Sequence, residues 1–413
     1  MNSIILSLVL PLTDSKSHHE EVNELELLAN TLGYAVLEKI HQNKNKINPS
    51  TYFGKGKIEN VANICKSLNC KLLIINDDIG PGHHKSIKKI CGTEISVIDR
   101  TQLILDIFNS HAKTKEAKTQ IKLATLEYML PRLVGQWTHL ERQMGGLGTR
   151  GGPGEKQIEI DRRLIRKSIS NLKNNLKKIQ NDHNNQIKNR VNIFKIALTG
   201  YTNSGKSTLL KELTGYEAYI KDQLFATLDT VTKKIILPSK TKVLISDTVG
   251  FLRKLPHNLI ASFRSTLSEI IEADLIIKVV DISSSDLNGH IQTINETLKF
   301  LDAHKTPVLY VFNKIDLIED SNMFDLIVKK YNNSIFISAS KKLNINRLID
   351  KIDELAHNEL CTLKIKILHN QLSLIKYIYE EMTVLKRNDK YDCVNFDVEG
   401  TKKSIEYIKS KLK

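Results

Sequence analysis

The chain has 413 residues, more than one hydrophobic core usually serves, so we expect two to four domains. Its 41% hydrophobic content excludes an intrinsically disordered protein. The apolar segment Ile4–Leu10 is too short to span a bilayer and follows no Lys or Arg, so we expect a buried strand rather than a signal peptide. A net charge of +15 makes nucleic acid the first partner to consider, the alternative being a solvated lysine-rich surface.

The five cysteines are scattered and form no C-x-x-C pair. This pattern is typical of a reducing compartment and predicts neither a disulfide framework nor a zinc site. We therefore expect a cytoplasmic protein and leave open a peripheral association with a membrane. We also expect a monomer.

Residues 1–103 alternate strand-like and helix-like segments, which predicts a small α/β domain. Short buried strands are expected at Lys71–Ile75 and Glu94–Ile98, and helices at Val61–Leu68 and His83–Ile90.

Residues 104–190 have a helical pattern that a glycine-rich loop over residues 144–154 interrupts. One helix is expected from Ile104 to Leu130 and a second from Glu155 to Gln180, followed by a polar linker over Gln180–Asn192. The apolar residues of the second helix follow a seven-residue rhythm, typical of a helix that packs lengthwise on a partner. They are Ile158, Ile165, Ile169, Leu172, Leu176 and Ile179. We expect an antiparallel helical hairpin with a glycine-rich tip.

The second arm of this hairpin is strongly basic. Residues 156–190 contain ten Lys or Arg and three Asp or Glu, so they carry seven of the fifteen net positive charges. A charged face on an exposed helix is often only solvated, but this asymmetry beside a Gly/Arg tip favours contact with RNA.

The remaining chain completes a multidomain α/β fold. Residues 193–358 alternate strands and helices, which predicts a second α/β domain. Residues 362–413 predict a strand, a helix, a hairpin around Arg387–Tyr391 and a final helix.

A phosphate-binding loop follows the apolar strand Ile193–Thr199 and precedes the helical segment Thr208–Leu213. In this context, a G-x-x-x-x-G-K-S loop points its N–H groups at phosphates, and the helix dipole adds to the attraction. We expect Lys206 to act as a catalytic residue on the β- and γ-phosphates and Ser207 to bind Mg²⁺. The loop comprises Gly200, Tyr201, Thr202, Asn203, Ser204, Gly205, Lys206 and Ser207.

A second motif, D-x-x-G, ends the apolar strand Val243–Ser246. Its Asp is expected to hold the magnesium through water, and its Gly N–H to approach the γ-phosphate. The motif comprises Asp247, Thr248, Val249 and Gly250.

The base-recognition motif N-K-x-D ends a third strand, Leu309–Phe312. Asp316 can accept hydrogen bonds from the guanine N1–H and exocyclic amine, a donor pair that adenine lacks, so we expect selection of GTP over ATP. Asn313 is expected to brace the loop and the base. Backbone recognition of the guanine oxygen is expected after the strand Ile335–Ile337. The two segments comprise Asn313, Lys314, Ile315, Asp316, Ser338, Ala339 and Ser340.

A threonine between the first two motifs is needed to sense the γ-phosphate and complete the Mg²⁺ shell. Thr227 is expected in that catalytic role, with Thr230 and Thr232 as alternatives. The segment expected at the nucleotide comprises Phe225, Ala226, Thr227, Leu228 and Asp229.

Phe251 follows D-x-x-G where many regulatory GTPases have the Gln that orients the attacking water. Because Phe cannot hydrogen-bond water, we expect slow intrinsic hydrolysis that a docking partner accelerates. Asn203 is similar to the residue that holds potassium in cation-dependent GTPases, so K⁺ is a second candidate cofactor.

Beyond these motifs, the chain resembles the HflX family of ribosome-associated GTPases along nearly its whole length. The matching segments are Gly54–Lys57, Asp99–Ala124, Leu130–Leu133, Gly146–Arg150 leading into Asp161–Arg163, Leu224–Asp229 and Asp247–Phe251. The resemblance implies binding at the large ribosomal subunit and splitting of stalled or idle ribosomes, with the hairpin tip reaching the peptidyl-transferase region. It also implies ribosome-stimulated hydrolysis and ATP binding by the N-terminal domain, where Gly54–Lys57 is either a phosphate contact or a basic turn.

Two other functions remain open. A GTP-gated RNA-binding or ribosome-assembly factor would use the basic hairpin without separating subunits. A signalling GTPase that acts on a protein would leave the basic arm and the glycine tip without a role.

Overall fold

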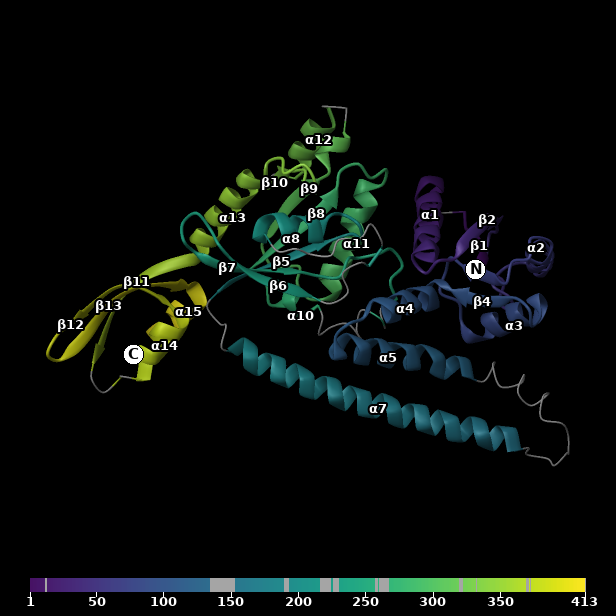
Figure 1. Ribbon diagram of the computed structural model, residues 1–413, viewed down its shortest axis with the longest axis horizontal. Coiled ribbons are helices and arrows are strands. Elements are labelled where there is room, and N and C mark those ends of the chain that lie inside the picture. Colours follow the sequence, from purple (N-terminus) through teal and green to yellow (C-terminus); the bar gives the residue numbers. More distant parts are fainter. Residues whose placement is uncertain are drawn as a thin grey trace.

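The computed structural model describes residues 1–11, 13–133, 153–188, 193–215, 224–225, 230–256, 259, 267–318, 322–331, 333–368, 371 and 373–412. Three β-sheets follow one another along the chain, each with its own helices (Figure 1). No helix in the described ranges has the length and apolar composition needed to cross a bilayer.

The N-terminal sheet is parallel, with strand order β2-β1-β3-β4. Successive residues of β1 alternate between its faces, so Ile5 packs with α1 and α4, whereas Ile4 and Leu6 pack with α2 and α3. The elements are β1 (Asn2–Val9), α1 (Ser15–Thr31), β2 (Ala35–Asn43), α2 (Lys55–Ser67), β3 (Leu72–Ile75), α3 (Pro81–Cys91), β4 (Ser96–Asp99) and α4 (Arg100–His111). The strands and helices predicted between residues 61 and 98 are confirmed.

The stretch predicted as one helix over residues 104–130 is two helices, α4 and α5 (Lys115–Met129), followed by the short η1 (Leu130–Arg132). Ala112 has an extended backbone that ends α4, and the Thr114 side chain caps α5 by accepting from the Ala117 N–H at 3.1 Å. The apolar residues of α4 are buried in the N-terminal core. The chain therefore leaves the N-terminal domain at α5.

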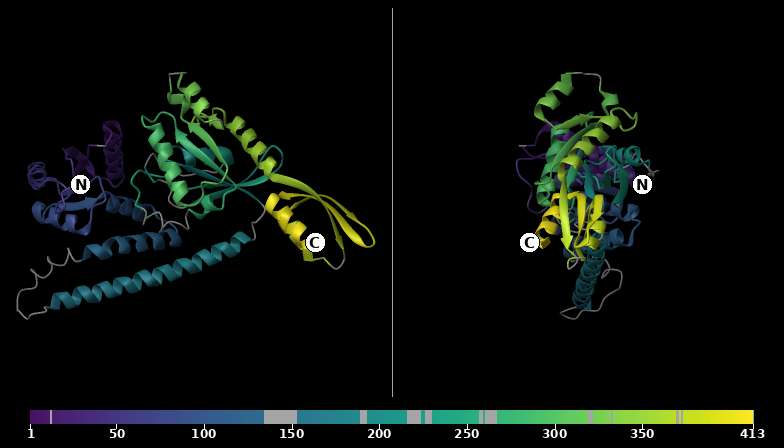
Figure 2. Two further views of the ribbon diagram at one scale, coloured as in Figure 1. Left: turned by 180° about the vertical axis from the view of Figure 1, so that it is seen from behind. Right: turned by 90° about the vertical axis from the view of Figure 1, so that its left-hand side faces the viewer.

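Helix α7 (Pro153–Lys188) runs beside α5 and beyond it (Figures 1 and 2). An ion pair of 2.8 Å joins Lys173 to Glu127 on α5. The seam residues Ile165, Ile169 and Leu172 are half-buried. The linker predicted from Gln180 is wrong as far as Lys188, because that polar segment lacks Gly and Pro and the helix continues through it.

The central sheet has strand order β10-β9-β8-β5-β7-β6, in which β6 alone is antiparallel to its neighbour. Helices α8 and α13 cover one face, and α10 and α11 cover the other. The elements are β5 (Phe194–Gly200), α8 (Lys206–Thr214), β6 (Val231–Ile236), β7 (Lys242–Asp247), α10 (Ser268–Ile271), β8 (Leu275–Asp281), α11 (Leu287–Phe300), β9 (Val308–Asn313), η3 (Ile315–Leu317), α12 (Asn322–Lys330), β10 (Ser334–Phe336) and α13 (Ile345–Glu359).

The C-terminal sheet is antiparallel, with order β11-β13-β12, and α14 and α15 pack on it. Its elements are β11 (Leu360–Leu368), α14 (Ser373–Glu381), β12 (Thr383–Asp389), β13 (Cys393–Thr401) and α15 (Lys402–Leu412). The predicted order of strand, helix, hairpin and helix is confirmed.

One hydrophobic cluster extends from the N-terminal core into the central domain. Phe108 of α4 packs edge-to-face on Phe225, with ring centroids 4.6 Å apart. The two domains therefore share buried apolar surface beside the nucleotide motifs.

Candidate functional site

The phosphate loop lies between β5 and α8, at the carboxyl edge of the central sheet. Gly205 precedes α8 with φ +90°, a left-handed conformation that a side chain disfavours, and a Cβ there would also clash with the Asn313 side chain. The loop leads directly into the N-terminus of α8, where the first N–H groups of a helix attract anions.

Lys206 is buried at the start of α8. Its ammonium donates to the carbonyl oxygens of Tyr201 at 2.8 Å and Gly200 at 3.3 Å. Burial lowers the pKa of this ammonium to about 8, although Asp247 opposes the shift. Anionic phosphates would favour the charged form, so nucleotide binding should raise the pKa of this ammonium.

The D-x-x-G motif continues from β7 toward the phosphate loop. The Ser207 hydroxyl donates to the Asp247 carboxylate at 2.6 Å, and the buried Thr248 hydroxyl donates to the Leu198 carbonyl at 2.7 Å. A hydroxyl and a carboxylate are hard oxygen ligands of the kind that Mg²⁺ prefers.

Gly250 and Phe251 lie directly on the phosphate loop. The Phe251 N–H donates to the Gly200 carbonyl, and the Thr202 N–H donates to the Phe251 carbonyl, each at 2.9 Å. A Cβ on Gly250 would lie 2.9 Å from the Thr202 Cα and 3.0 Å from the Lys206 ammonium. Phe251 itself is buried.

Asn313 connects the base-recognition motif to both neighbouring loops. Its amide donates to the Ser204 carbonyl at 2.9 Å and its oxygen accepts from the Ala339 N–H at 3.0 Å. The Lys314 ammonium pairs with Asp281 at 2.7 Å. Asp316 lies in η3 with an exposed side chain. These contacts bring the phosphate loop, N-K-x-D and S-A-S segments together.

Residues 226–229, including the expected catalytic Thr227, lie outside the described residues. Phe225, expected at the nucleotide, has its ring buried against Phe108 instead. Of the two alternatives, Thr232 shares a hydrogen bond of 2.9 Å with the Ser246 hydroxyl, and Thr230 is half-buried just before β6.

Two buried hydroxyls of the phosphate loop, those of Thr202 and Ser204, have no hydrogen-bond partner within the described part of the chain. Buried polar groups are rarely left unsatisfied, so these hydroxyls have hydrogen-bonding capacity that a polar ligand of the loop would use. The described residues contain no cluster of three His, Cys, Asp or Glu that could hold a metal. A magnesium ion held by one hydroxyl, water and phosphates needs no such cluster, and Ser207 beside Asp247 fits it.

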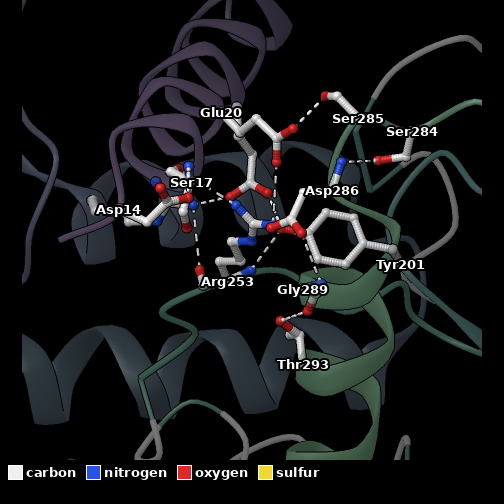
Figure 3. Close-up of polar contacts among 12 residues, drawn as sticks. Asp14, Ser17, Glu20, Tyr201, Arg253, Ser284, Ser285, Asp286, Gly289 and Thr293 are labelled. Atoms are coloured by element: carbon white, nitrogen blue, oxygen red, sulfur yellow. Dashed lines mark hydrogen bonds and ion pairs between the residues drawn. The ribbon is translucent and has the colours of Figure 1, made fainter.

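Sequence reasoning missed the contact between this site and the N-terminal domain. Arg253, two residues after Phe251, pairs with Glu20 of α1 at 3.3 Å and also with Asp286 (Figure 3). Lys254 pairs with Glu21 at 2.7 Å and Asp77 at 2.9 Å. Single charges of this kind have no periodicity or motif spacing, so the sequence gives no sign that they meet.

The carboxyl edge of the N-terminal sheet contacts α5 and η1 through polar side chains. Asp99, at the end of β4, accepts from Tyr128 of α5 at 2.8 Å and pairs with Arg132 at 3.1 Å. Ligands of parallel α/β sheets usually bind at this edge. The Gly54–Lys57 segment lies at the same edge beyond β2, where Gly54 precedes the first turn of α2 and its N–H donates to the Gln42 side chain near the end of β2.

Comparison with known proteins covers most of the chain. Residues 19–109 match the family described as GTP-binding GTPase N-terminal, residues 111–190 the GTP-binding GTPase Middle Region, residues 195–314 the 50S ribosome-binding GTPase and residues 325–413 the HflX C-terminal domain.

Similar proteins from other organisms bear the name GTPase HflX. The protein of Caldanaerobacter subterraneus subsp. tengcongensis is 42% identical over 349 residues, which cover 84% of this chain and 79% of that protein. The Escherichia coli K12 protein is 37% identical over 338 residues, covering 81% and 79%. A Sulfolobus solfataricus GTP-binding protein solved in complex with GDP is 26% identical, with a TM-score of 0.44 and coverage of 87% and 99%. The chain belongs to the HflX family of P-loop GTPases and is a GTP hydrolase.

Proposed function

We propose that this GTPase binds the large ribosomal subunit and intact ribosomes and dissociates stalled or idle ribosomes. The observation that carries this proposal is the basic α7 in a member of a ribosome-associated GTPase family. Beyond the seam on α5, α7 exposes Arg163, Arg166 and Lys167 on its outer side. Duplex RNA is recognised largely through its phosphates and 2′-hydroxyls, which suits such a face.

We also propose that the four segments 1–103, 104–190, 193–358 and 362–413 are its functional units. In the third, the phosphate loop, D-x-x-G, N-K-x-D and S-A-S residues bind GTP, while Lys206 stabilises charge on the phosphates. Ser207 and Thr227 would hold Mg²⁺, which neutralises phosphate charge when bound. Potassium beside Asn203 is a further proposal. ATP binding at the N-terminal sheet would require Arg132 and Tyr128 to leave Asp99.

In this proposal, Phe251 is the reason that GTP hydrolysis depends on a partner. Its buried apolar ring cannot orient a water, so hydrolysis by the isolated protein should be slow. A ribosome that docks against the site would supply or reposition a polar group. Large subunits should therefore stimulate hydrolysis.

Sedimentation of intact ribosomes with the protein and a nonhydrolysable GTP analogue tests this function. We expect separated subunits with the protein on the large one. Stable association without separation would instead support the assembly-factor alternative, and absence of binding at low salt would support a signalling GTPase.

A matched pair of charge reversals tests the role of α7 in the same assay. Arg163→Glu combined with Lys167→Glu should weaken ribosome binding. The slope of log K against log salt concentration should become shallower by roughly one to two. The control is Lys85→Glu combined with Lys89→Glu, which reverses two exposed charges at the same four-residue spacing on α3. Equal effects of both pairs would mean that α7 has no special role.

The pKa of Lys206 predicts a pH dependence of nucleotide affinity. Below about pH 8 the ammonium is charged in free and bound protein, so affinity is constant; above it, binding must take up a proton and affinity falls. Affinity for Mg-GTP should drop roughly fourfold between about pH 7 and about pH 8.5. Calorimetry in two buffers of different ionisation enthalpy should show proton uptake at the higher pH. A flat affinity without uptake would contradict this assignment.

A further inference from the structure

The segment after D-x-x-G is folded down onto the phosphate loop in this structure. The two hydrogen bonds between Phe251 and the loop form a β-bridge to Tyr201. Gly250 also lies against the loop backbone, where a Cβ on it would lie only 2.9 Å from the Thr202 Cα. The Phe251 carbonyl occupies the Thr202 N–H of the same loop. A γ-phosphate placed between Gly250 and the phosphate loop would have to displace these contacts, so we expect GTP to lift the segment.

Tyr201 joins the folded segment to the N-terminal domain. Its hydroxyl accepts from the Arg253 N–H at 3.0 Å and donates to the Glu24 carboxylate of α1. The ring stacks on His290, with centroids 3.8 Å apart and planes at 13°. Burial lowers the pKa of His290 to about 4, so the imidazole is neutral at physiological pH. The hydroxyl of this loop residue is thus directed toward α1.

Arg100 holds the other side of the same peptide segment. Its side chain is 1% exposed. The guanidinium pairs with Glu24 and donates to the Arg253 carbonyl at 3.3 Å and to the Asn76 side chain at 3.1 Å. Arg253 therefore has its N–H held by Tyr201 and its C=O held by Arg100. Both holding groups meet at one carboxylate, Glu24, whose pKa burial raises despite the opposing charge of Arg100.

Ionic contacts surround this centre. The Arg253 guanidinium lies between Glu20 of α1 and Asp286 at the start of α11, beside the Tyr201 ring (Figure 3). Ser285 also contacts Glu20. These contacts join α1 to the segment that follows Gly250. Movement of that segment is therefore linked to the docking of the N-terminal domain.

We propose that Tyr201, Glu24, Arg100 and Arg253 form an interdomain latch that holds the D-x-x-G segment in the folded-down, GDP-compatible conformation. Lifting by GTP breaks the latch and loosens α1. By thermodynamic reciprocity, a partner that displaces the N-terminal domain favours GTP. Tyr201 and Glu24 are therefore positioning residues, which act on the nucleotide through the segment that follows Gly250.

Titration of the purified full chain with fluorescent GDP and a nonhydrolysable GTP analogue tests the latch. Tyr201→Phe removes only the hydroxyl, and Glu24→Gln removes only the charge. Each should raise the affinity ratio of the GTP analogue to GDP about tenfold, the effect of losing one hydrogen bond to a charged group. The double variant should give nearly the same ratio, because both changes break one coupled unit.

Tyr310→Phe on β9 and Glu26→Gln on α1 are matched controls that alter the same chemical groups outside the latch and should leave the ratio unchanged. A purely structural interface would lower both affinities and the Tm together without changing the ratio. Glu24→Gln removes the buried charge partner of Arg100 and so carries a risk of unfolding. If it does not fold, the affinity ratio of Tyr201→Phe tests the latch by itself.

An unchanged ratio in folded Tyr201→Phe, or additive effects near a hundredfold in the double variant, would overturn the latch. The latch rests on the proposed GTP-dependent switching. A chain that binds no GTP analogue would refute that switching, whereas binding with an unchanged ratio would refute the latch alone.

Discussion

Lys206→Ala should weaken GTP and GDP binding by about 10²- to 10³-fold, because a buried cation paired with phosphate is worth roughly 3–4 kcal/mol. Its ammonium is buried and bonded to two loop carbonyls in the free protein. Removing it eliminates a buried charge, so the free energy of unfolding should not fall. Isothermal titration with each nucleotide, beside a thermal melt, measures both effects.

The control for this change is Lys342→Ala. That lysine is largely exposed and pairs with Glu212 on the surface of the same domain, where a salt bridge contributes little. It should bind nucleotide like the unmodified protein. If Lys206→Ala bound GTP within a fewfold of the unmodified protein, the phosphate loop would not be the phosphate site.

Asp316→Asn should reverse the choice of base. The carboxylate is expected to accept from guanine N1–H and the exocyclic amine, whereas an asparagine offers one acceptor and one donor. Xanthine carries an oxygen in place of the amine, so the variant should prefer xanthosine triphosphate over GTP. GTP affinity should fall about 10²-fold or more, since the buried base edge loses a charged hydrogen bond and faces a mismatched donor.

Competition binding with GTP, ATP and xanthosine triphosphate measures this reversal. Asp325→Asn changes an exposed carboxylate on α12 and should leave the selectivity unchanged. Because Asp316 is exposed in the free protein, its replacement should not alter the Tm. Unchanged preference for GTP in Asp316→Asn would place base recognition on other residues.

Local patterns were enough to predict most secondary structure and the motifs of the site. Strand ends carry the chemistry in parallel α/β sheets, so Asp247 and Asn313 could be placed near the phosphate loop from their positions alone. Asn313 does contact Ser204 across the sheet edge. The break between α4 and α5 was missed because Ala112 and Thr114 are weak signals without their backbone angles.

The interface between the domains could not be predicted in this way. Glu24 lies on α1, 177 residues before Tyr201, and nothing in the spacing of either segment indicates the other. Phe225 was expected at the nucleotide from its place before Thr227, yet its ring packs on Phe108. Such contacts depend on how two domains dock, which one-dimensional periodicity does not encode.

A structure of the chain with Mg²⁺ and a nonhydrolysable GTP analogue tests the central claim most directly. It should show the Lys206 ammonium on the phosphates, the Ser207 hydroxyl on the metal and the Asp316 carboxylate on the guanine edge, with the Phe251 bridge open. Nucleotide bound at another surface, or a base that leaves Asp316 in solvent, would contradict the assignment of this chain's GTP site.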